Sequence, residues 1–221
     1  MTKAFFKSGI FLFFIIRICY AQVPVGIEPR HHKIFQNAYI RILDVRIVPG
    51  DTTLFHTHEK PSVFIVLNNA KTGAELFSEG EISDATVTNG NIWFEGFYYD
   101  PLIHRIWNID TTEFHVLEIE LLNKTYKEID ASLPQKSIRM LFNEKPVRGF
   151  SGLLSARSTI NLGVKKYPLL VIALNDFSDG VTVNDKLFKE KGKFLFIPEG
   201  RKITLVNKGT VAAQFVILEL K

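Results

Sequence analysis

The chain has almost no cysteine, and this scarcity excludes several kinds of chemistry. One of its 221 residues is a cysteine, Cys19, which lies in an N-terminal segment that we expect to be removed. The remaining chain would then have no disulfide, no thiol nucleophile and no cysteine-ligated zinc. It also lacks a Gly-x-Ser-x-Gly sequence, the usual frame of a serine nucleophile on a sharp turn.

A basic cluster is missing as well. The formal net charge is +4, but Lys3, Lys7 and Arg17 lie in the first 21 residues, where there is no acidic residue. The rest of the chain has 24 basic and 23 acidic residues and contains no basic run. Because nucleic-acid binding requires a clustered basic surface, we expect no nucleic-acid partner.

The N-terminus has the pattern of a secretory signal peptide. Lys3 and Lys7 precede the apolar run 10–16, and Cys19-Tyr20-Ala21 is a small-x-small cleavage site. The apolar run is much shorter than the roughly 20 residues that span a membrane. We therefore expect cleavage after Ala21, no stable membrane insertion of the mature chain, and export to a periplasm or the cell exterior.

Long amphipathic helices are also absent, and short strands take their place. Several segments alternate between apolar and polar residues or form short apolar runs, and Gly, Pro, Asn or Asp bounds them. Many short strands separated by turn residues predict an all-β barrel or sandwich. The expected strands cover residues 40–48, 63–67, 114–122, 169–174 and 213–220.

An internal repeat divides the chain. The segment Lys60–Asn68 matches Tyr167–Asn175 at an offset of 107, and Asn108 matches Asn207 at an offset of 99. Two matches in the same order indicate two copies of one all-β unit. The predicted organisation is a signal peptide (1–21), an N-terminal barrel with a metal site (22–125), a linker (126–148) and a degenerate C-terminal barrel (149–221).

Three histidines form the strongest candidate site. His56 and His58 are two residues apart in an extended segment, so both side chains point to one face. A later strand of an antiparallel barrel can bring His104 beside them. Three neutral imidazoles suit one divalent transition metal ion (Fe, Mn, Ni or Zn) and leave positions open for water or substrate. The alternative interpretation is that they are ordinary polar residues on half-buried strands.

These residues resemble the two motifs of the cupin superfamily. Gly50, His56 and His58 fit Gly-x5-His-x-His of the first motif, and His104 and Asn108 fit the end of the second, His-x3-Asn. The second half is similar to the second motif over its full length, with Gly192, Pro198, Gly200, Ile203 and Asn207 in place. The resemblance implies two tandem cupin-type barrels of the double-stranded β-helix or jelly-roll kind, as in a quercetin-dioxygenase-like secreted bicupin.

The sequence differs from the two cupin motifs at several ligand positions. The glutamate of the first motif would fall near Ser62 or Val63, neither of which is acidic, and Glu59 should point to the opposite face. Whether Glu59 or Ser62 approaches the metal is left open. In the second half, Gly163, Lys165 and Ile203 occupy the three histidine positions, so the resemblance implies a C-terminal barrel without metal.

The remaining histidines and the aromatic residues around His104 are further candidates for the site. We expect the pair His31-His32 to be exposed in a connecting segment and His115 to be packed or on the surface, with no ligand role. The aromatic-rich stretch around His104 fills the core or lines a pocket for an aromatic or sugar ligand. The pocket candidates are Ser62, Phe94, Tyr98, Tyr99 and Asn108.

The sequence thus predicts an exported metal-binding bicupin. One hypothesis is a dioxygenase-like enzyme that acts on a small organic substrate through a three-histidine metal site. The alternatives are a non-catalytic module that binds a sugar or aromatic molecule, and a structural protein in which the histidines have no role. Cupin barrels pair through sheet edges, so a homodimer is also left open.

Overall fold

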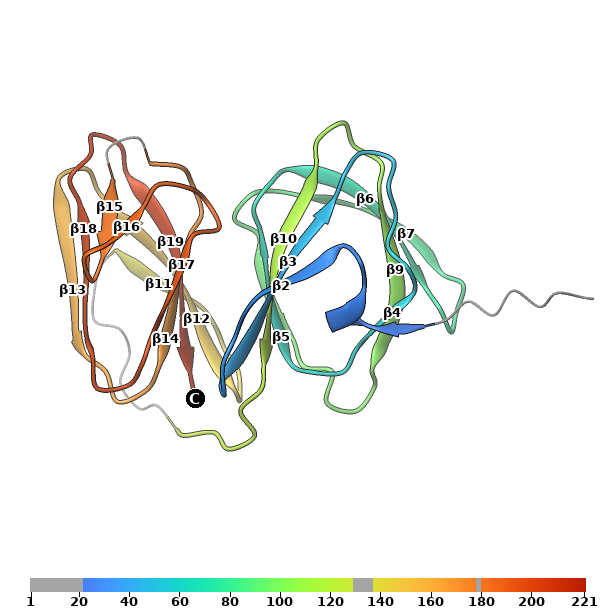
Figure 1. Ribbon diagram of the computed structural model, residues 1–221, viewed down its shortest axis with the longest axis horizontal. Coiled ribbons are helices and arrows are strands. Elements are labelled where there is room, and N and C mark those ends of the chain that lie inside the picture. The colour runs from blue at the N-terminus through green and yellow to red at the C-terminus, as the bar shows by residue number, and fades with distance from the viewer. Residues whose placement is uncertain (1–21, 129–136, 178–179) are drawn as a thin grey trace, which may run out of the picture.

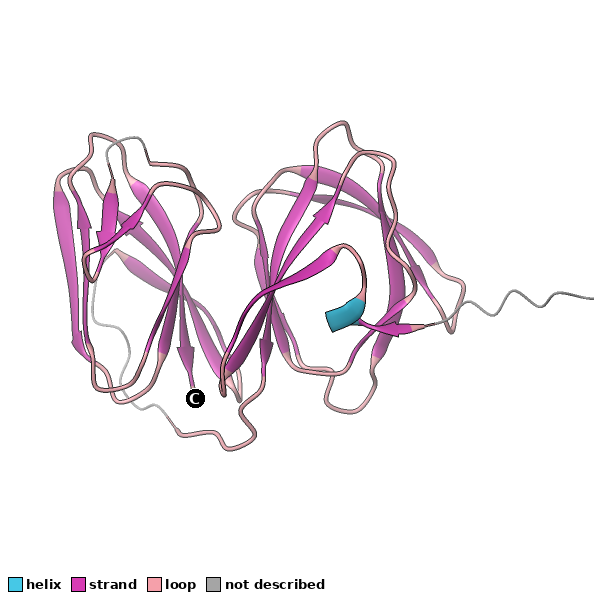
Figure 2. Ribbon diagram, viewed as in Figure 1, coloured by secondary structure: helices cyan, strands magenta, loops and turns pink. Residues whose placement is uncertain are grey.

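The structure, a computed structural model, describes residues 22–128, 137–177 and 180–221. The predicted signal peptide lies outside the described residues, as do residues 129–136 of the predicted linker. Strands make up most of the described chain, and one short 3-10 turn, η1 (Val25–Ile27), is the helical element among them (Figure 2). In the described part of the chain, no helix is long and apolar enough to cross a membrane.

The first half of the chain forms two facing five-stranded sheets. Their strand orders are β1-β4-β9-β6-β7 and β2-β3-β10-β5-β8. Apart from the parallel pair β1–β4, the strands pair antiparallel. The strands are β1 (Val23–Pro24), β2 (His31–Gln36), β3 (Ile40–Ile47), β4 (His56–His58), β5 (Ser62–Val66), β6 (Ala70–Leu76), β7 (Ile82–Val87), β8 (Ile92–Glu95), β9 (Leu102–Asn108) and β10 (Phe114–Leu121).

The second half repeats this architecture with one strand fewer. Its sheets have the orders β11-β12-β19-β14-β17 and β13-β18-β15-β16. The fold is therefore all-β with two tandem jelly-roll barrels, as the sequence predicted (Figure 1). The strands are β11 (Ile138–Asn143), β12 (Val147–Leu154), β13 (Ser158–Val164), β14 (Leu169–Ala173), β15 (Val181–Val183), β16 (Lys186–Phe188), β17 (Phe194–Ile197), β18 (Lys202–Asn207) and β19 (Ala213–Leu220).

A hydrophobic cluster joins the two barrels, in addition to the core inside each of them. In Figure 1 the sheet of β3, β5 and β10 faces the sheet of β12, β14 and β19. Buried side chains of both sheets form a single cluster, which includes Ile65 and Ile119 from the first barrel and Ile172 and Leu218 from the second. Residues alternate along each strand, so every second side chain of β10 packs toward the second barrel and the others face the interior of the first. All eight residues of β10 are consequently buried.

The strand register reproduces the internal repeat. Arg41 pairs with Glu120 in the first barrel, and Arg148 pairs with Glu219 in the second, at the same offsets of 107 and 99. Both pairs are ion pairs between the side chains. The repeat in the sequence thus corresponds to equivalent strands and contacts in three dimensions.

The segment predicted as a linker contains regular structure. Strand β11 and the start of β12 lie within residues 126–148. Strand β11 is an edge strand that pairs with β12 alone, and its side chains are half-buried or exposed. An edge strand with an exposed face has a more polar sequence than a central strand, which is why composition alone indicated a linker.

Candidate metal centre

Four imidazole rings converge inside the first barrel. His56 and His58 lie on the same face of β4, and the antiparallel register places His104 of β9 directly opposite His56. Nε2 of His58 is 3.1 Å from Nε2 of His104, and the ring centroids of His56 and His104 are 4.6 Å apart. The structure therefore brings together the three histidines of the sequence motifs.

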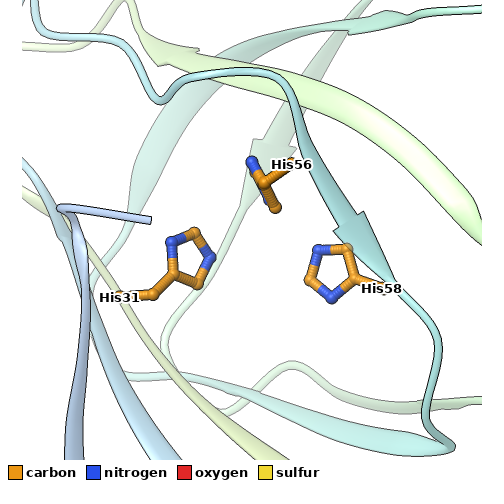
Figure 3. A group of neighbouring side chains, drawn as sticks. All are labelled: His31, His56 and His58. Atoms are coloured by element: carbon orange, nitrogen blue, oxygen red, sulfur yellow. The ribbon is translucent and has the colours of Figure 1, made fainter. Parts of the chain in front are cut away.

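The fourth ring belongs to His31, which the sequence analysis expected to be exposed. Its centroid lies 4.6 Å from that of His56, and Figure 3 shows it on the side of the group opposite His58. His31 is 7% exposed, whereas its neighbour His32 is exposed. The sequence contains two adjacent histidines, and only the path of the strand decides which of them points inward.

In three of the four rings, Nδ1 forms a hydrogen bond with an oxygen atom outside the cluster. A neutral imidazole that donates a hydrogen bond from Nδ1 presents the lone pair of Nε2 on the other side of the ring. Metal-binding histidines have this arrangement, in which an outer carboxylate or carbonyl orients the ring. The three bonds are His31 Nδ1 to Glu28 Oε2 (2.6 Å), His56 Nδ1 to the Leu54 carbonyl (2.9 Å) and His58 Nδ1 to Glu118 Oε1 (3.0 Å).

The free nitrogen atoms fit a transition metal ion. Nε2 of His56 is buried and has no hydrogen-bond partner among the described residues. Ligand nitrogens of His31, His56 and His58 lie within 4.8 Å of one another. Two nitrogens about 2.1 Å from one ion and at a right angle to each other are about 3 Å apart, which is the separation observed between His58 and His104. The donor set consists of imidazoles, which suit iron, nickel, copper and zinc.

Burial keeps His56 and His104 neutral, whereas the carboxylate of Glu118 behind His58 stays charged. Burial lowers the pKa of His56 to about 3, and the nearby His31 and His58 act in the same direction. Burial, followed by His56 and His58, lowers the pKa of His104 to about 2. Burial would raise the pKa of Glu118, but His58 outweighs it and the pKa is lowered. Neutral imidazoles are the form that binds a metal ion.

These shifts predict that the metal-free protein loses stability as the pH falls. The pKa values of His56 and His104 lie below the value of 6.5 for an exposed histidine, so below pH 6.5 the unfolded chain binds more protons than the folded one. Each histidine lowers the free energy of unfolding by up to about 1.4 kcal/mol per pH unit below 6.5. Urea denaturation of the chelator-treated protein between pH 7 and 5 measures this slope. A His104→Gln variant should have a shallower slope, and equal slopes would contradict the assignment.

The imidazoles form the floor of a cavity of about 330 Å³. Phe64 and Trp93 stack on each other with ring centroids 5.2 Å apart. Phe97 stacks on His58 at 5.5 Å and has a φ of 45°, in the left-handed region that a phenylalanine rarely adopts. The lining is His31, Val45, His56, His58, Phe64, Trp93, Glu95, Phe97, Leu102, His104, Ile106, Phe114 and Val116.

The five residues predicted for the pocket lie elsewhere. Phe94 faces the second barrel and packs near Phe142, because residues 93 and 94 of β8 point to opposite faces. Tyr98 and Tyr99 are 47% and 94% exposed. The aromatic lining comes instead from Phe64, Trp93, Phe97 and Phe114.

Asn108 and Ser62 have other roles. The side-chain amide of Asn108 donates to the carbonyl oxygens of Ile47 and Thr112, and Asn207 makes the equivalent pair of bonds in the second barrel. Asn108 therefore ties two segments of the barrel together.

Ser62 lies behind the imidazoles rather than among them. It is fully buried, and its hydroxyl donates to Glu118 Oε1, the oxygen atom that also binds His58. Glu59 is exposed. The carboxylate that contacts a motif histidine is thus Glu118, on strand β10, which was not identified from the sequence. The sequence feature that could have identified Glu118 is a glutamate within a mostly apolar strand. Such a glutamate is unusual because a buried carboxylate needs a partner.

The second barrel has a filled interior at the corresponding position. Gly163 of β13 pairs with Ile203 of β18, as His56 pairs with His104. Ile203 is fully buried in the core of the second barrel together with Leu205, Phe188 and Phe215. Apolar side chains thus occupy the space that the imidazoles and the cavity occupy in the first barrel.

Comparisons with known proteins identify the fold. No protein-family model and no curated protein sequence matches the chain. Solved structures do match it over most of its length. The bacterial pirin YhhW from Escherichia coli, in complex with nickel(II), is 13% identical, with a TM-score of 0.61 over 86% of this chain and 90% of the pirin.

Two further structures are similar to the same extent. Salicylate 1,2-dioxygenase from Pseudaminobacter salicylatoxidans is 8% identical, with a TM-score of 0.58 over 82% of this chain and 71% of the dioxygenase. A cupin 2 conserved barrel domain protein from Leptotrichia buccalis is 12% identical, with a TM-score of 0.54 over 86% and 87% of the two chains. Both the motifs and these structures lead to one conclusion: the chain has the fold of the cupin superfamily, in two tandem barrels.

Proposed function

We propose that the protein is a metal-binding cupin that acts on a small organic molecule in its first barrel, as a dioxygenase-like oxidoreductase. The observation that carries the proposal is the orphaned Nε2 of His56, buried among three other imidazoles at the floor of an apolar cavity. A buried nitrogen without a partner costs free energy unless a ligand satisfies it.

The motif histidines would hold the ion. His56, His58 and His104 come from two paired strands, and Glu118 and the Leu54 carbonyl orient two of them. When bound, a divalent ion supplies Lewis acidity and, for a redox-active metal such as iron, electron transfer. The pirin has been solved with nickel(II), which supports a metal role for this fold but not a particular metal for this chain.

The cavity wall favours a flat, uncharged substrate. Eight of its thirteen lining residues are apolar or aromatic, and none is lysine or arginine. The one carboxyl group in the lining belongs to Glu95, whose pKa is raised by partial burial. A carboxylate ligand would therefore meet no cation other than the metal ion, and we propose neutral phenols, enols or ketones as the substrate class.

The apolar lining excludes water from the reacting end of the substrate, and Phe97 covers His58 from the cavity side. Glu95 is the candidate proton acceptor, since its carboxyl group is the one acid on the wall, and a raised pKa increases its basicity. Its carboxylate oxygens would accept the hydroxyl proton of a phenol or enol as the substrate binds.

An oxygen electrode tests the function. Metal-free protein is reconstituted with iron(II), manganese(II), nickel(II) or zinc(II) and mixed with neutral phenols, enols and ketones, and with their carboxylated analogues. We expect oxygen uptake with at least one redox-active metal, none with zinc, and a higher kcat/KM for the neutral compounds. A Glu95→Gln variant should retain binding and lose most of the turnover. Metal binding without turnover for any compound would contradict the enzymatic proposal.

A non-catalytic binding module is the second candidate function. Glu95 lines the cavity but remains exposed to solvent, so the wall encloses no carboxyl group, and an apolar cavity of this kind also suits a ligand that is only bound. Calorimetric titration of the zinc-loaded protein with the same compounds distinguishes the two. Micromolar binding in the absence of turnover with any metal would favour the module.

We also propose export of the mature chain, on the pattern of Lys3, Lys7 and the apolar run 10–16. Intact-mass measurement of the protein from the periplasm or medium should give a chain that begins at Gln22. A membrane-bound species that retains Met1 would contradict this proposal.

A further inference from the structure

We propose that His31 is a fourth metal ligand, and that it couples metal binding to docking of the N-terminal strap, which we define as residues Val23–His31. This inference rests on the proposed metal-binding function. It concerns a residue outside the motif histidines, at the first position of strand β2.

The ring of His31 occupies a ligand position. Its centroid lies 4.6 Å from that of His56 and 6.2 Å from that of His58, and its ligand nitrogen lies within 4.8 Å of theirs. Nδ1 is taken by Glu28, so Nε2 is the atom that remains for an ion. Figure 3 shows the three rings around a common space, with His31 on a separate ribbon from the other two.

Glu28 connects the strap to the strand that carries the motif histidines. Its side chain is buried, and Oε2 accepts from His31 Nδ1 at 2.6 Å and from the backbone N–H of Arg30 at 2.7 Å. Its other oxygen, Oε1, accepts from the backbone N–H of Leu54 at 3.1 Å. The carbonyl of Leu54 in turn orients His56. One carboxylate thus positions His31 directly and His56 through a single residue.

The carboxylate of Glu28 accepts hydrogen bonds from three donors, on His31, Arg30 and Leu54, which fix its position behind the ring of His31. A negative charge on the Nδ1 side of an imidazole makes its Nε2 a stronger ligand.

The strap is attached mainly by polar contacts at the site. Strand β1 pairs with β4 over two residues, with Val23 opposite His56, and the backbone N–H of Val23 donates to Phe55 at 3.1 Å. Arg30 forms an ion pair with Asp51 at 2.7 Å. Val25 is the buried apolar anchor of the strap, whereas Ile27 is 70% exposed. At its C-terminal end the strap continues into β2, where His31 pairs with Val45 of β3. The part of the strap before His31 has only the short attachment described above, which provides little stability of its own.

A metal ion that binds His31 would therefore stabilise the docked strap. A ligand that binds one conformation more tightly shifts the equilibrium toward it, and the coupling acts equally in both directions. The docked strap increases the affinity for the metal, and the metal protects the strap from opening. A three-histidine site without His31 would show neither effect.

Cobalt(II) provides the test, because its visible spectrum reports the number and type of ligands. Affinity is measured by competition with a chelator, and the spectrum is recorded for His31→Ala and for His32→Ala. The second variant is a matched control, since His32 is the adjacent exposed histidine. We expect His31→Ala to lose at least tenfold in affinity and to change the cobalt spectrum, and His32→Ala to resemble the wild type. Glu28→Gln should lose roughly 10- to 100-fold.

Hydrogen exchange of the unmodified protein provides a second readout, independent of any variant. Metal should slow exchange of the backbone amides of Arg30 and His31 by at least tenfold, relative to amides in strand β14 of the second barrel. Equal affinity and spectra for the two histidine variants, or strap amides that metal does not protect, would overturn the inference while leaving the three-histidine site intact. Failure of the wild type to bind cobalt would overturn the proposed function together with the inference.

Discussion

Replacing His58 by alanine is expected to lower the affinity for a divalent metal ion more than about 100-fold while the barrel stays folded. His58 binds Glu118 through Nδ1 and lies 3.1 Å from His104 through Nε2, so its loss removes both a ligand and the orientation of the set. Loss of an outer partner alone typically costs 10- to 100-fold in affinity, and loss of the ligand itself costs more. The fold survives because apolar packing supplies most of its stability.

Elemental analysis and chelator competition on protein purified without a histidine tag measure this effect. The wild type should bind one ion per chain, since Gly163 and Ile203 replace two of the ligands in the second barrel. His115→Gln is the matched control: His115 is also buried but pairs with Asp44, away from the cluster. Full metal occupancy in a variant that lacks His56, His58 and His104 would refute the site.

The second large effect is expected in the other barrel, where Arg148→Met should lower the free energy of unfolding by about 3 to 5 kcal/mol. Arg148 is 3% exposed and its Nε donates to Glu219, which is fully buried. The hydroxyl of Tyr167 also donates to Glu219, at 2.8 Å. Removal of the guanidinium leaves a buried carboxylate without its countercharge, and this uncompensated charge is the source of the cost.

The repeat supplies the control for this prediction. Arg41→Met breaks the equivalent pair with Glu120, but the side chain of Arg41 is 23% exposed, so water can replace part of the lost interaction. Urea denaturation should therefore show a smaller loss for Arg41→Met than for Arg148→Met. Arg148→Met combined with Glu219→Leu should recover most of the stability. A loss below about 1 kcal/mol in Arg148→Met would contradict the burial argument.

The sequence predicted the strands closely because burial and side-chain alternation leave a local signal. The expected strand 114–122 corresponds to β10, Phe114–Leu121, and the expected strand 213–220 to β19, Ala213–Leu220. Both are central strands whose residues are almost all buried, and most of these residues are apolar. The edge strand β11 has no such run of buried residues, and composition alone therefore did not distinguish it from a linker.

The site could be predicted only in part. His56 and His58 share a face because residues two apart in a strand always do, and a motif frame indicated His104. The cavity wall depends instead on which of two adjacent aromatic residues points inward. Trp93 lines the cavity and Phe94 faces the other barrel, an outcome set by one residue of strand register.

The all-β character, the duplication and the three motif histidines are predictable from the amino-acid sequence, because each depends on spacing along a single strand or on similarity between two segments. Tertiary structure alone decided the positions of Glu28, His31 and Glu118 around the imidazoles. Glu118 is 60 residues from His58 along the chain, and the ring of His31 on β2 packs against that of His56 on β4. Such a contact forms when two sheets close around a core, and it cannot be predicted from a local pattern of residues.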